Sequence, residues 1–177
     1  LLELIKTEDS DFDLYTMINE FAQNQLHKGI VPASDTPNFI GNRVGIFGIM
    51  STIKLAIEKR ITIQEADLLT GKVCGRPNSA TFRTADLIGL DTLKNVANTT
   101  YEKSTDDESI EVFKIPNIIE DLIKKGNLGQ KTNGGFYKKN KLGNIEVYQA
   151  DNKAYTHIKK INMNLDESVI NNGDINQ

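Results

Sequence analysis

The sequence predicts a mainly α-helical fold, a compact bundle with short strands near the N-terminus and a β-hairpin-like appendage near residue 140. Three observations support this fold class. Apolar residues recur with helical spacing in several segments, and Gly and Pro separate these segments at short intervals. Aromatic and β-branched residues become frequent after Gly129. Because the helical segments are short and interrupted, we expect a bundle rather than a coiled coil.

The first 34 residues are predicted to form a strand, a helix and a second strand. LLELI at residues 1–5 is typical of a short buried strand, and the Pro in IVPAS at 30–34 favours a sheet edge. Between them, apolar residues with helical spacing predict a helix over 11–28, which Gly29 ends. The chain begins without Met, in a strand already under way, so we expect it to be cut from a longer protein.

A long helix is predicted over residues 37–59, with Pro37 at its first position. Apolar residues cover most of its circumference, which predicts a central place in the core. Gly41, Gly45 and Gly48 each lower helix stability by ~1 kcal/mol relative to Ala. Tight helix packing is the favoured explanation for these glycines, ahead of close approach by a ligand.

Two further helices are bounded by recognisable caps and stops. Thr62 and Glu65 are spaced as a capping box at the start of a helix over 62–71. A helix over 79–89 has Ser79 as its expected cap and a Gly at its end. Both signals are local, so they also predict where each helix starts.

The C-terminal third changes from helix to strand signals. A helix over 116–126 begins with Pro and ends with Gly, and a hairpin is expected around residues 140–144. Residues 159–177 are rich in Asn, Asp and Lys, which predicts a mobile tail or the start of a further segment. The expected organisation is a helical domain over 1–139 and an appendage over 140–177.

Composition excludes several classes of protein. The 177 residues are 38% hydrophobic and 25% charged, with a net charge of -3, and no basic stripe suggests nucleic-acid binding. No apolar run approaches the ~18 residues that span a bilayer. The single cysteine, Cys74, fits a reducing compartment, so we expect a cytoplasmic protein.

Common catalytic and metal-binding motifs are missing from the sequence. The two histidines, His27 and His157, are far apart, and neither HExxH nor CxxC occurs, so no metal site is expected. His27 is best explained as a surface residue that complements a helix C-terminus. The glycines of the long helix differ in spacing from the dinucleotide-binding GxGxxG turn, so this chain alone is not expected to bind a dinucleotide in the usual way.

Two polar residues remain as candidates for chemistry. Glu3 lies inside an apolar strand, where a carboxylate needs a partner unless the strand lies at an edge and Glu3 points to water. Asn42 lies in the first turns of the long helix, where its amide can bond back to the preceding turn or reach a substrate oxygen. Spacing alone leaves both alternatives open for Glu3 and favours the local bond for Asn42.

Three segments together resemble a known family. DTPNFIGNR (35–43), GRPNSATFRTADLIGLDT (75–92) and GQKTNGGFYK (129–138) occur in this order in the C-terminal helical domain of the L-3-hydroxyacyl-CoA dehydrogenases. The resemblance covers residues 1–139 and is greatest to the multidomain bacterial β-oxidation type. It implies a helical bundle of the kind also found at the C-terminus of 6-phosphogluconate dehydrogenase.

The resemblance also implies roles for individual residues. Family members bind NAD in an N-terminal Rossmann domain, and their catalytic histidine lies just before the strand matched by LLELI, so neither is in this chain. Glu3 matches the glutamate that pairs with this histidine, and Asn42 matches the asparagine that contacts the substrate. Arg43 is expected to be structural, anchoring the helix start or an interdomain contact. The family often has glycine in place of Asn38, which predicts a modest adjustment of that loop.

The implied reaction is the reversible oxidation of a 3-hydroxyacyl-CoA to the 3-ketoacyl-CoA with NAD as the hydride acceptor. Glu3 would orient the histidine that removes the hydroxyl proton, and Asn42 would hold the substrate oxygen. The fragment alone is expected to be inactive, and because this domain usually forms the dimer in the family, the resemblance also implies a homodimer. The alternative is a helical assembly module without catalysis, whose apolar central helix serves dimerisation.

Overall fold

The computed structural model describes residues 1–104 and 106–161, and it confirms the predicted mainly helical fold class. The α-helices are α1 (Phe12–Asn24), α2 (Gly41–Glu58), α3 (Ile63–Thr70), α4 (Phe82–Ile88), α5 (Leu90–Lys103) and α6 (Asn117–Lys124). The strands are β1 (Leu2–Lys6), β2 (Ile30–Ser34), β3 (Tyr137–Lys139), β4 (Ile145–Gln149) and β5 (Ala154–His157). Short 3-10 helices occupy Lys72–Cys74, Ile110–Phe113 and Gln130–Thr132.

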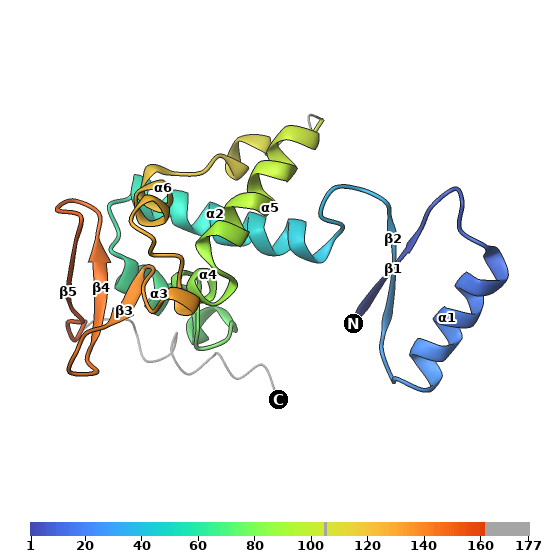
Figure 1. Cartoon of the computed structure of the whole chain (residues 1–177), viewed down its shortest axis with the longest axis horizontal. Coiled ribbons are helices and arrows are strands. Elements are labelled where there is room, and N and C mark those ends of the chain that lie inside the picture. Colours follow the sequence, from blue (N-terminus) through green and yellow to red (C-terminus); the bar gives the residue numbers. More distant parts are fainter. Residues whose placement is uncertain (105, 162–177) are drawn as a thin grey trace.

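The first three elements form a unit that stands apart from the other helices (Figure 1). Strands β1 and β2 pair in parallel, with Leu2 opposite Ile30, and helix α1 connects them. Asp11 caps α1 by accepting a hydrogen bond from the Leu14 amide. We call residues 1–34 the βαβ unit and the assembly of α2 to α6 with β3 to β5 the helical body.

The βαβ unit buries little of its apolar surface, which differs from the expected buried strand. Leu1 and Leu2 of LLELI are exposed, because only β2 and α1 flank β1 within the described residues. Helix α1 also leaves several apolar side chains exposed, most of them along one face. They are Phe12, Leu14, Met17, Ile18 and Phe21.

Helix α2 begins at Gly41 rather than at Pro37. The prediction was wrong because Asn38 and Phe39 adopt positive φ angles of 63° and 50°, which no right-handed helix contains. Residues 35–40 therefore form an irregular linker between β2 and α2, and the helix starts where the backbone returns to the right-handed region.

The core lies on one side of α2, so its apolar residues, which cover most of its circumference, are buried on that side only. Its buried side chains are Ile46, Ile49, Met50, Ile53 and Ala56. On another face, Ile40, Val44, Phe47 and Leu55 form an exposed apolar stripe in which Val44 is 65% exposed. We call these four residues the α2 stripe. Intervals of four, three and eight residues place them along one face of a helix.

The glycines of α2 are not explained by tight helix packing. A Cβ added at Gly45 would meet no atom within 4 Å, and one added at Gly48 would meet only the Arg76 guanidinium at 4.0 Å. A Cβ at Gly41 would lie 2.6 Å from the Glu3 carboxylate. Close approach therefore accounts for Gly41 alone, and the approaching group is a side chain of the βαβ unit.

The other helices cover the buried face of α2. Leu90, Leu93 and Ala97 of α5, with Ile119 and Leu122 of α6, are fully buried in this core. Phe82 at the start of α4 packs edge-to-face on Phe136, with ring centroids 4.8 Å apart. These contacts join the middle and the end of the chain into one apolar core.

Local capping rules succeed for α3 and fail for α4. The predicted capping box of Thr62 and Glu65 is present, and Gly89 ends α4 with a φ of 95°. Ser79 does not cap α4. The carboxylate of Asp67 in α3 instead accepts hydrogen bonds from the amides of residues 81–83 at the start of α4.

The predicted hairpin is present and extends to a three-stranded sheet. Strands β3 and β4 pair antiparallel on either side of residues 140–144, and β5 pairs with the other edge of β4. Val147 and Tyr148 of β4 are buried in the core of the helical body. The expected mobile tail over 159–177 lies outside the described residues except for 159–161, and the division at residue 139 stays a prediction.

Candidate functional site

The Glu3 side chain reaches from β1 to the start of α2. One carboxylate oxygen, Oε2, accepts a hydrogen bond from the Ile40 amide at 2.9 Å, and Oε1 accepts one from the Gly41 amide at 2.7 Å. The first amides of a helix have no intrahelical acceptor, and the helix dipole favours an anion there. Glu3 therefore caps α2, which has no capping side chain of its own.

These two bonds are also the connection between the two parts of the molecule. Among the described residues, no other hydrogen bond or ion pair joins the βαβ unit to residues beyond the linker. The alternative in which Glu3 points freely into water is thus excluded, and its carboxylate is held at one end of α2.

Asn42 follows directly after the residue that Glu3 contacts. It lies in the first turn of α2 and is exposed, so its amide is accessible. The structure thus brings the two predicted site residues to the same end of one helix. A carboxylate and an amide, which can accept or donate hydrogen bonds to a ligand, are therefore both located at the start of α2.

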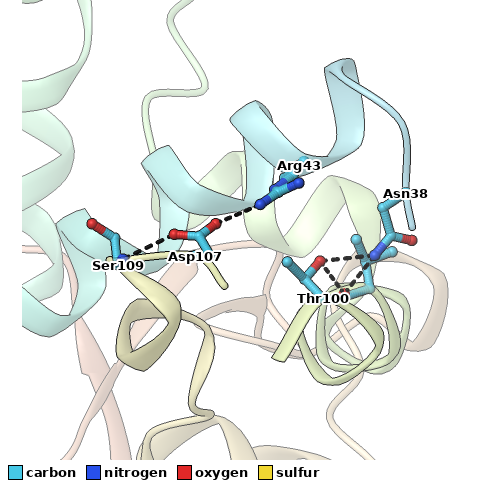
Figure 2. Close-up of polar contacts among 6 residues, drawn as sticks. Asn38, Arg43, Thr100, Asp107 and Ser109 are labelled. Atoms are coloured by element: carbon cyan, nitrogen blue, oxygen red, sulfur yellow. Dashed lines mark hydrogen bonds and ion pairs between the residues drawn. The ribbon is translucent and has the colours of Figure 1, made fainter. Parts of the chain in front are cut away.

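The same helix end is anchored to the helical body by two polar contacts (Figure 2). Asn38 donates hydrogen bonds from Nδ2 to the Val96 carbonyl oxygen and to Thr100 Oγ1 of α5. Arg43 forms an ion pair with Asp107, with 2.7 Å between Nη2 and Oδ2. Of the two structural roles expected for Arg43, anchoring the helix start or making an interdomain contact, this ion pair fits the first.

Asp86 links two of the sequence motifs. It is only 7% exposed, and its two carboxylate oxygens accept hydrogen bonds of 2.8 Å from the amides of Phe136 and Tyr137. Burial raises its pKa from 3.8 to about 6. Because both oxygens are engaged by backbone amides, Asp86 holds the GGFYK segment against α4 and is not free for proton transfer.

Asp67 has a similar structural role. Besides capping α4, it accepts a hydrogen bond from the Tyr137 hydroxyl at 2.9 Å. Burial raises the pKa of Asp67, and burial together with the Asp67 charge raises the pKa of Tyr137. Sequence reasoning missed both aspartates. The available signal was an acidic residue inside each apolar segment, EADLLT and TADLIG.

The remaining candidates lie elsewhere. His27 lies in the loop between α1 and β2, and His157 ends β5 in the sheet at the far end of the helical body (Figure 1). Within the described ranges, no three His, Cys, Asp or Glu side chains gather closely enough to hold a metal ion. No helix in the described part of the chain is long and apolar enough to cross a bilayer.

The described residues do not fit a dinucleotide cofactor. The start of α2, whose free amides are the kind of site that binds a phosphate group, is occupied by the Glu3 carboxylate. The turn between β1 and α1 has the sequence TEDSD, whose acidic residues would repel a pyrophosphate. A nicotinamide cofactor would need another part of the protein.

Comparison with known proteins places these features in a family context. Residues 39–139 match the model of the 3-hydroxyacyl-CoA dehydrogenase C-terminal domain. The chain is 41% identical over 163 residues to a probable 3-hydroxyacyl-CoA dehydrogenase of Bacillus subtilis, covering 92% of this chain and 20% of that protein. It is 41% identical over 141 residues to a protein of the same name from Deinococcus radiodurans, covering 80% and 40%. The chain thus spans less than half of these relatives.

Solved structures show the same fold. Mycobacterium tuberculosis FadB2 matches with a TM-score of 0.68 and 28% identity, over 77% of this chain and 46% of that chain. The (S)-3-hydroxybutyryl-CoA dehydrogenase PaaH1 of Ralstonia eutropha matches with a TM-score of 0.65 and 25% identity, over 75% and 45%. The arrangement of α2 and the surrounding helices is therefore shared with these enzymes.

Proposed function

Because the chain belongs to the 3-hydroxyacyl-CoA dehydrogenase C-terminal domain family, we propose that it forms the substrate-side and dimerisation part of an NAD-dependent enzyme. The complete protein would oxidise L-3-hydroxyacyl-CoA to 3-ketoacyl-CoA in fatty-acid β-oxidation. The observation that carries this proposal is the placement of Glu3 and Asn42 at one end of α2.

Glu3 would act on a histidine supplied by the part of the protein that precedes Leu1. A carboxylate has about four lone-pair directions, and the Ile40 and Gly41 amides use two of them. A histidine N–H can therefore be accepted without breaking the cap. The negative charge would hold the ring in the correct tautomer and stabilise the imidazolium that forms when the substrate hydroxyl is deprotonated.

Asn42 would hold the substrate oxygen. Its exposed amide can donate a hydrogen bond to the hydroxyl or carbonyl oxygen at the reacting carbon. The value of this contact is chiefly positional, because it holds the oxygen near the base. The rigid attachment of α2 to the helical body through its buried face supports this role.

The βαβ unit supports a preceding Rossmann-type domain as the NAD-binding part. Its two parallel strands have open edges within the described residues, and parallel sheets are normally covered on both faces. The exposed apolar face of α1 would be buried by such a domain. The cytoplasm is proposed as the location on the basis of the single free cysteine, Cys74.

The α2 stripe supports a homodimer and also the alternative function. Exposed apolar residues along one face of a central helix are typical of a subunit interface. The same stripe would suit a helical assembly module without catalysis. The two functions differ in whether the complete protein turns over a 3-hydroxyacyl-CoA.

The proposal is tested on the complete parent protein by NADH formation from a 3-hydroxyacyl-CoA. Glu3→Gln should lower kcat by ~100-fold or more, because the histidine loses its charged partner. The matched control Glu8→Gln removes an exposed carboxylate in the turn after β1 and should have no effect. The 177-residue chain alone should form no NADH.

The two functions give different results in this assay. A wild-type parent that forms dimers but no NADH would favour the assembly module. Turnover by the isolated chain, or full activity of Glu3→Gln, would contradict the proposed division of labour. Light scattering of wild type and of Val44→Asp measures the dimer, since a charge in the α2 stripe should give monomers.

A further inference from the structure

We propose that Asn38 is a positioning residue: its hydrogen bonds to α5 fix how the linker joins the βαβ unit to the helical body, and thereby where the Glu3 carboxylate lies. The catalytic consequence rests on the proposed function. The structural part, that the contact between Asn38 and α5 maintains the contact between Glu3 and α2, stands on the hydrogen bonds alone.

The Asn38 side chain forms a closed set of hydrogen bonds with α5 (Figure 2). Its Nδ2 lies 3.0 Å from the Val96 carbonyl oxygen and 2.8 Å from Thr100 Oγ1. Thr100 Oγ1 in turn donates to the Val96 carbonyl oxygen at 3.0 Å. Thr100 is fully buried and Asn38 is partly buried, so water competes little for these bonds. We call this set the Asn38 clamp.

The backbone of Asn38 requires an unusual residue. Its φ of 63° is in the left-handed region, which glycine and asparagine tolerate best. Glycine could adopt this φ angle but has no side chain that could bind α5. Asparagine satisfies the backbone and also supplies the two N–H donors that reach α5. The residue type therefore combines a turn with an attachment point.

Two opposing sets of contacts meet on the short segment 38–43. The Asn38 clamp and the ion pair of Arg43 with Asp107 hold it to the helical body, and Asp107 is itself held by the Ser109 amide at 2.8 Å. Glu3 binds the amides of residues 40 and 41 from the βαβ unit. Asn38 is the anchored residue nearest to β2, so it determines the path of the linker before α2 starts.

Loss of the Asn38 clamp should therefore weaken the hydrogen bonds of the Glu3 carboxylate. No other hydrogen bond or ion pair holds the βαβ unit to the helical body within the described residues. A freed linker would let the unit shift relative to α2, which would lengthen the bonds from Ile40 and Gly41 to the carboxylate. A misplacement of ~1 Å at a catalytic group can cost up to ~100-fold in rate.

The structural part is tested by NMR on the 177-residue chain. Amide protons that donate to a carboxylate resonate downfield, and Glu3→Gln defines the shift of the Ile40 and Gly41 signals when that acceptor is lost. Asn38→Gly should move both signals most of the way to those positions. Asn133→Gly is the matched control, because Asn133 also has a left-handed backbone, with a φ of 56°, and directly follows the distant 3-10 helix Gln130–Thr132. It should leave both signals unchanged.

A second pair of variants covers the case in which Asn38→Gly does not fold. Thr100→Val removes the hydroxyl that accepts from Asn38 and should move the two amide signals in the same direction, whereas Thr100→Ser keeps the hydroxyl and should restore them. Wild-type signals in both Asn38→Gly and Thr100→Val would overturn the proposal.

The catalytic consequence is tested in the complete parent protein. Asn38→Gly should lower kcat by ~10-fold with little change in the KM for NAD, because only the alignment of Glu3 is altered. An unchanged kcat together with shifted amide signals would overturn the catalytic consequence and keep the structural one. An inactive wild-type parent would refute the proposed function. The amide signals would still show whether the Asn38 clamp maintains the contact between Glu3 and α2.

Discussion

Gly135 offers the sharpest test of how the C-terminal motif is held. A Cβ at this position would lie 2.0 Å from Asp86 Oδ1 and 2.7 Å from the Gly129 Cα atom. Gly135, Asp86 and Gly129 are all buried, so the clash cannot be relieved toward solvent. Gly135→Ala therefore forces the Asp86 carboxylate away from the Phe136 amide, which it contacts at 2.8 Å.

The expected loss of stability follows from two contributions. A hydrogen bond to a charged group is worth ~1.5–3 kcal/mol, and overpacking a core costs ~1–3 kcal/mol. The lower chain entropy of unfolded Ala offsets ~0.4–1 kcal/mol of this. We expect Gly135→Ala to lower the free energy of unfolding by ~1.5–5.5 kcal/mol, a large part of the ~5–15 kcal/mol typical of a domain.

Urea unfolding of the 177-residue chain measures this loss. The sequence has no Trp and five Tyr, four of which lie in the helical body, so tyrosine fluorescence reports on that body. With a urea dependence of ~1–3 kcal/mol per molar, the midpoint should fall by at least ~0.5 M. Gly45→Ala is the control for the added methyl group, which meets nothing within 4 Å there, so its midpoint should not fall below that of wild type. A Gly135→Ala midpoint equal to wild type would refute the assigned role of Asp86.

Three further predictions concern Gly45, Gly41 and the charge of Asp86. Gly45→Ala should raise the free energy of unfolding by ~1 kcal/mol in the urea assay. Gly41→Ala should lower the kcat of the parent protein, because its Cβ would lie 2.6 Å from Glu3 Oε1 and displace the carboxylate. A kcat of Gly41→Ala equal to that of wild type would argue against a catalytic need for the contact between Glu3 and α2. The pKa of Asp86 is raised from 3.8 to about 6 in the folded protein, so protonation of Asp86 stabilises the folded state. This contribution to the free energy of unfolding, ~3 kcal/mol, is fully present below pH ~3.8 and is lost as the pH rises through ~6. Carboxyl NMR titration should give an Asp86 midpoint near 6, and a midpoint below 4 would contradict this.

Local signals in the sequence predicted much of the helical body. The capping box of Thr62 and Glu65, the stop at Gly89 and the hairpin around residues 140–144 all depend on neighbours within a few residues. Such interactions can be recognised from spacing alone. Strand β5 was missed because DNKAYTH is polar and gains its strand conformation from pairing with β4.

The errors share a different physical origin. The start of α2 is set by the positive φ angles of the linker, and the start of α4 is set by Asp67, which precedes the amides it caps by 14 to 16 residues. Contacts of this range leave no periodic trace in the sequence. The central burial expected for α2 was only partly right, because apolar composition alone does not tell which apolar faces are buried.

The candidate site was only partly predictable. An acidic residue in an apolar strand singled out Glu3, but family resemblance was needed to assign it a role. That Glu3 caps α2 depends on the juxtaposition of two segments nearly forty residues apart, which the sequence does not reveal. The resemblance also identified Asn38 as unusual, and only the structure shows its bonds to α5.

The two buried aspartates limit how this fold can be recombined. Asp67 and Asp86 bind the amides and the hydroxyl of a segment that arrives fifty to seventy residues later in the chain. A chimera that takes its C-terminal strands from a relative must therefore inherit both carboxylates and the glycine at 135 as one set. A crossover within residues 59–66 takes Asp67, Asp86 and Gly135 from the same parent protein. A crossover between α4 and β3 takes the carboxylate acceptors from one parent and their hydrogen-bond donors from the other.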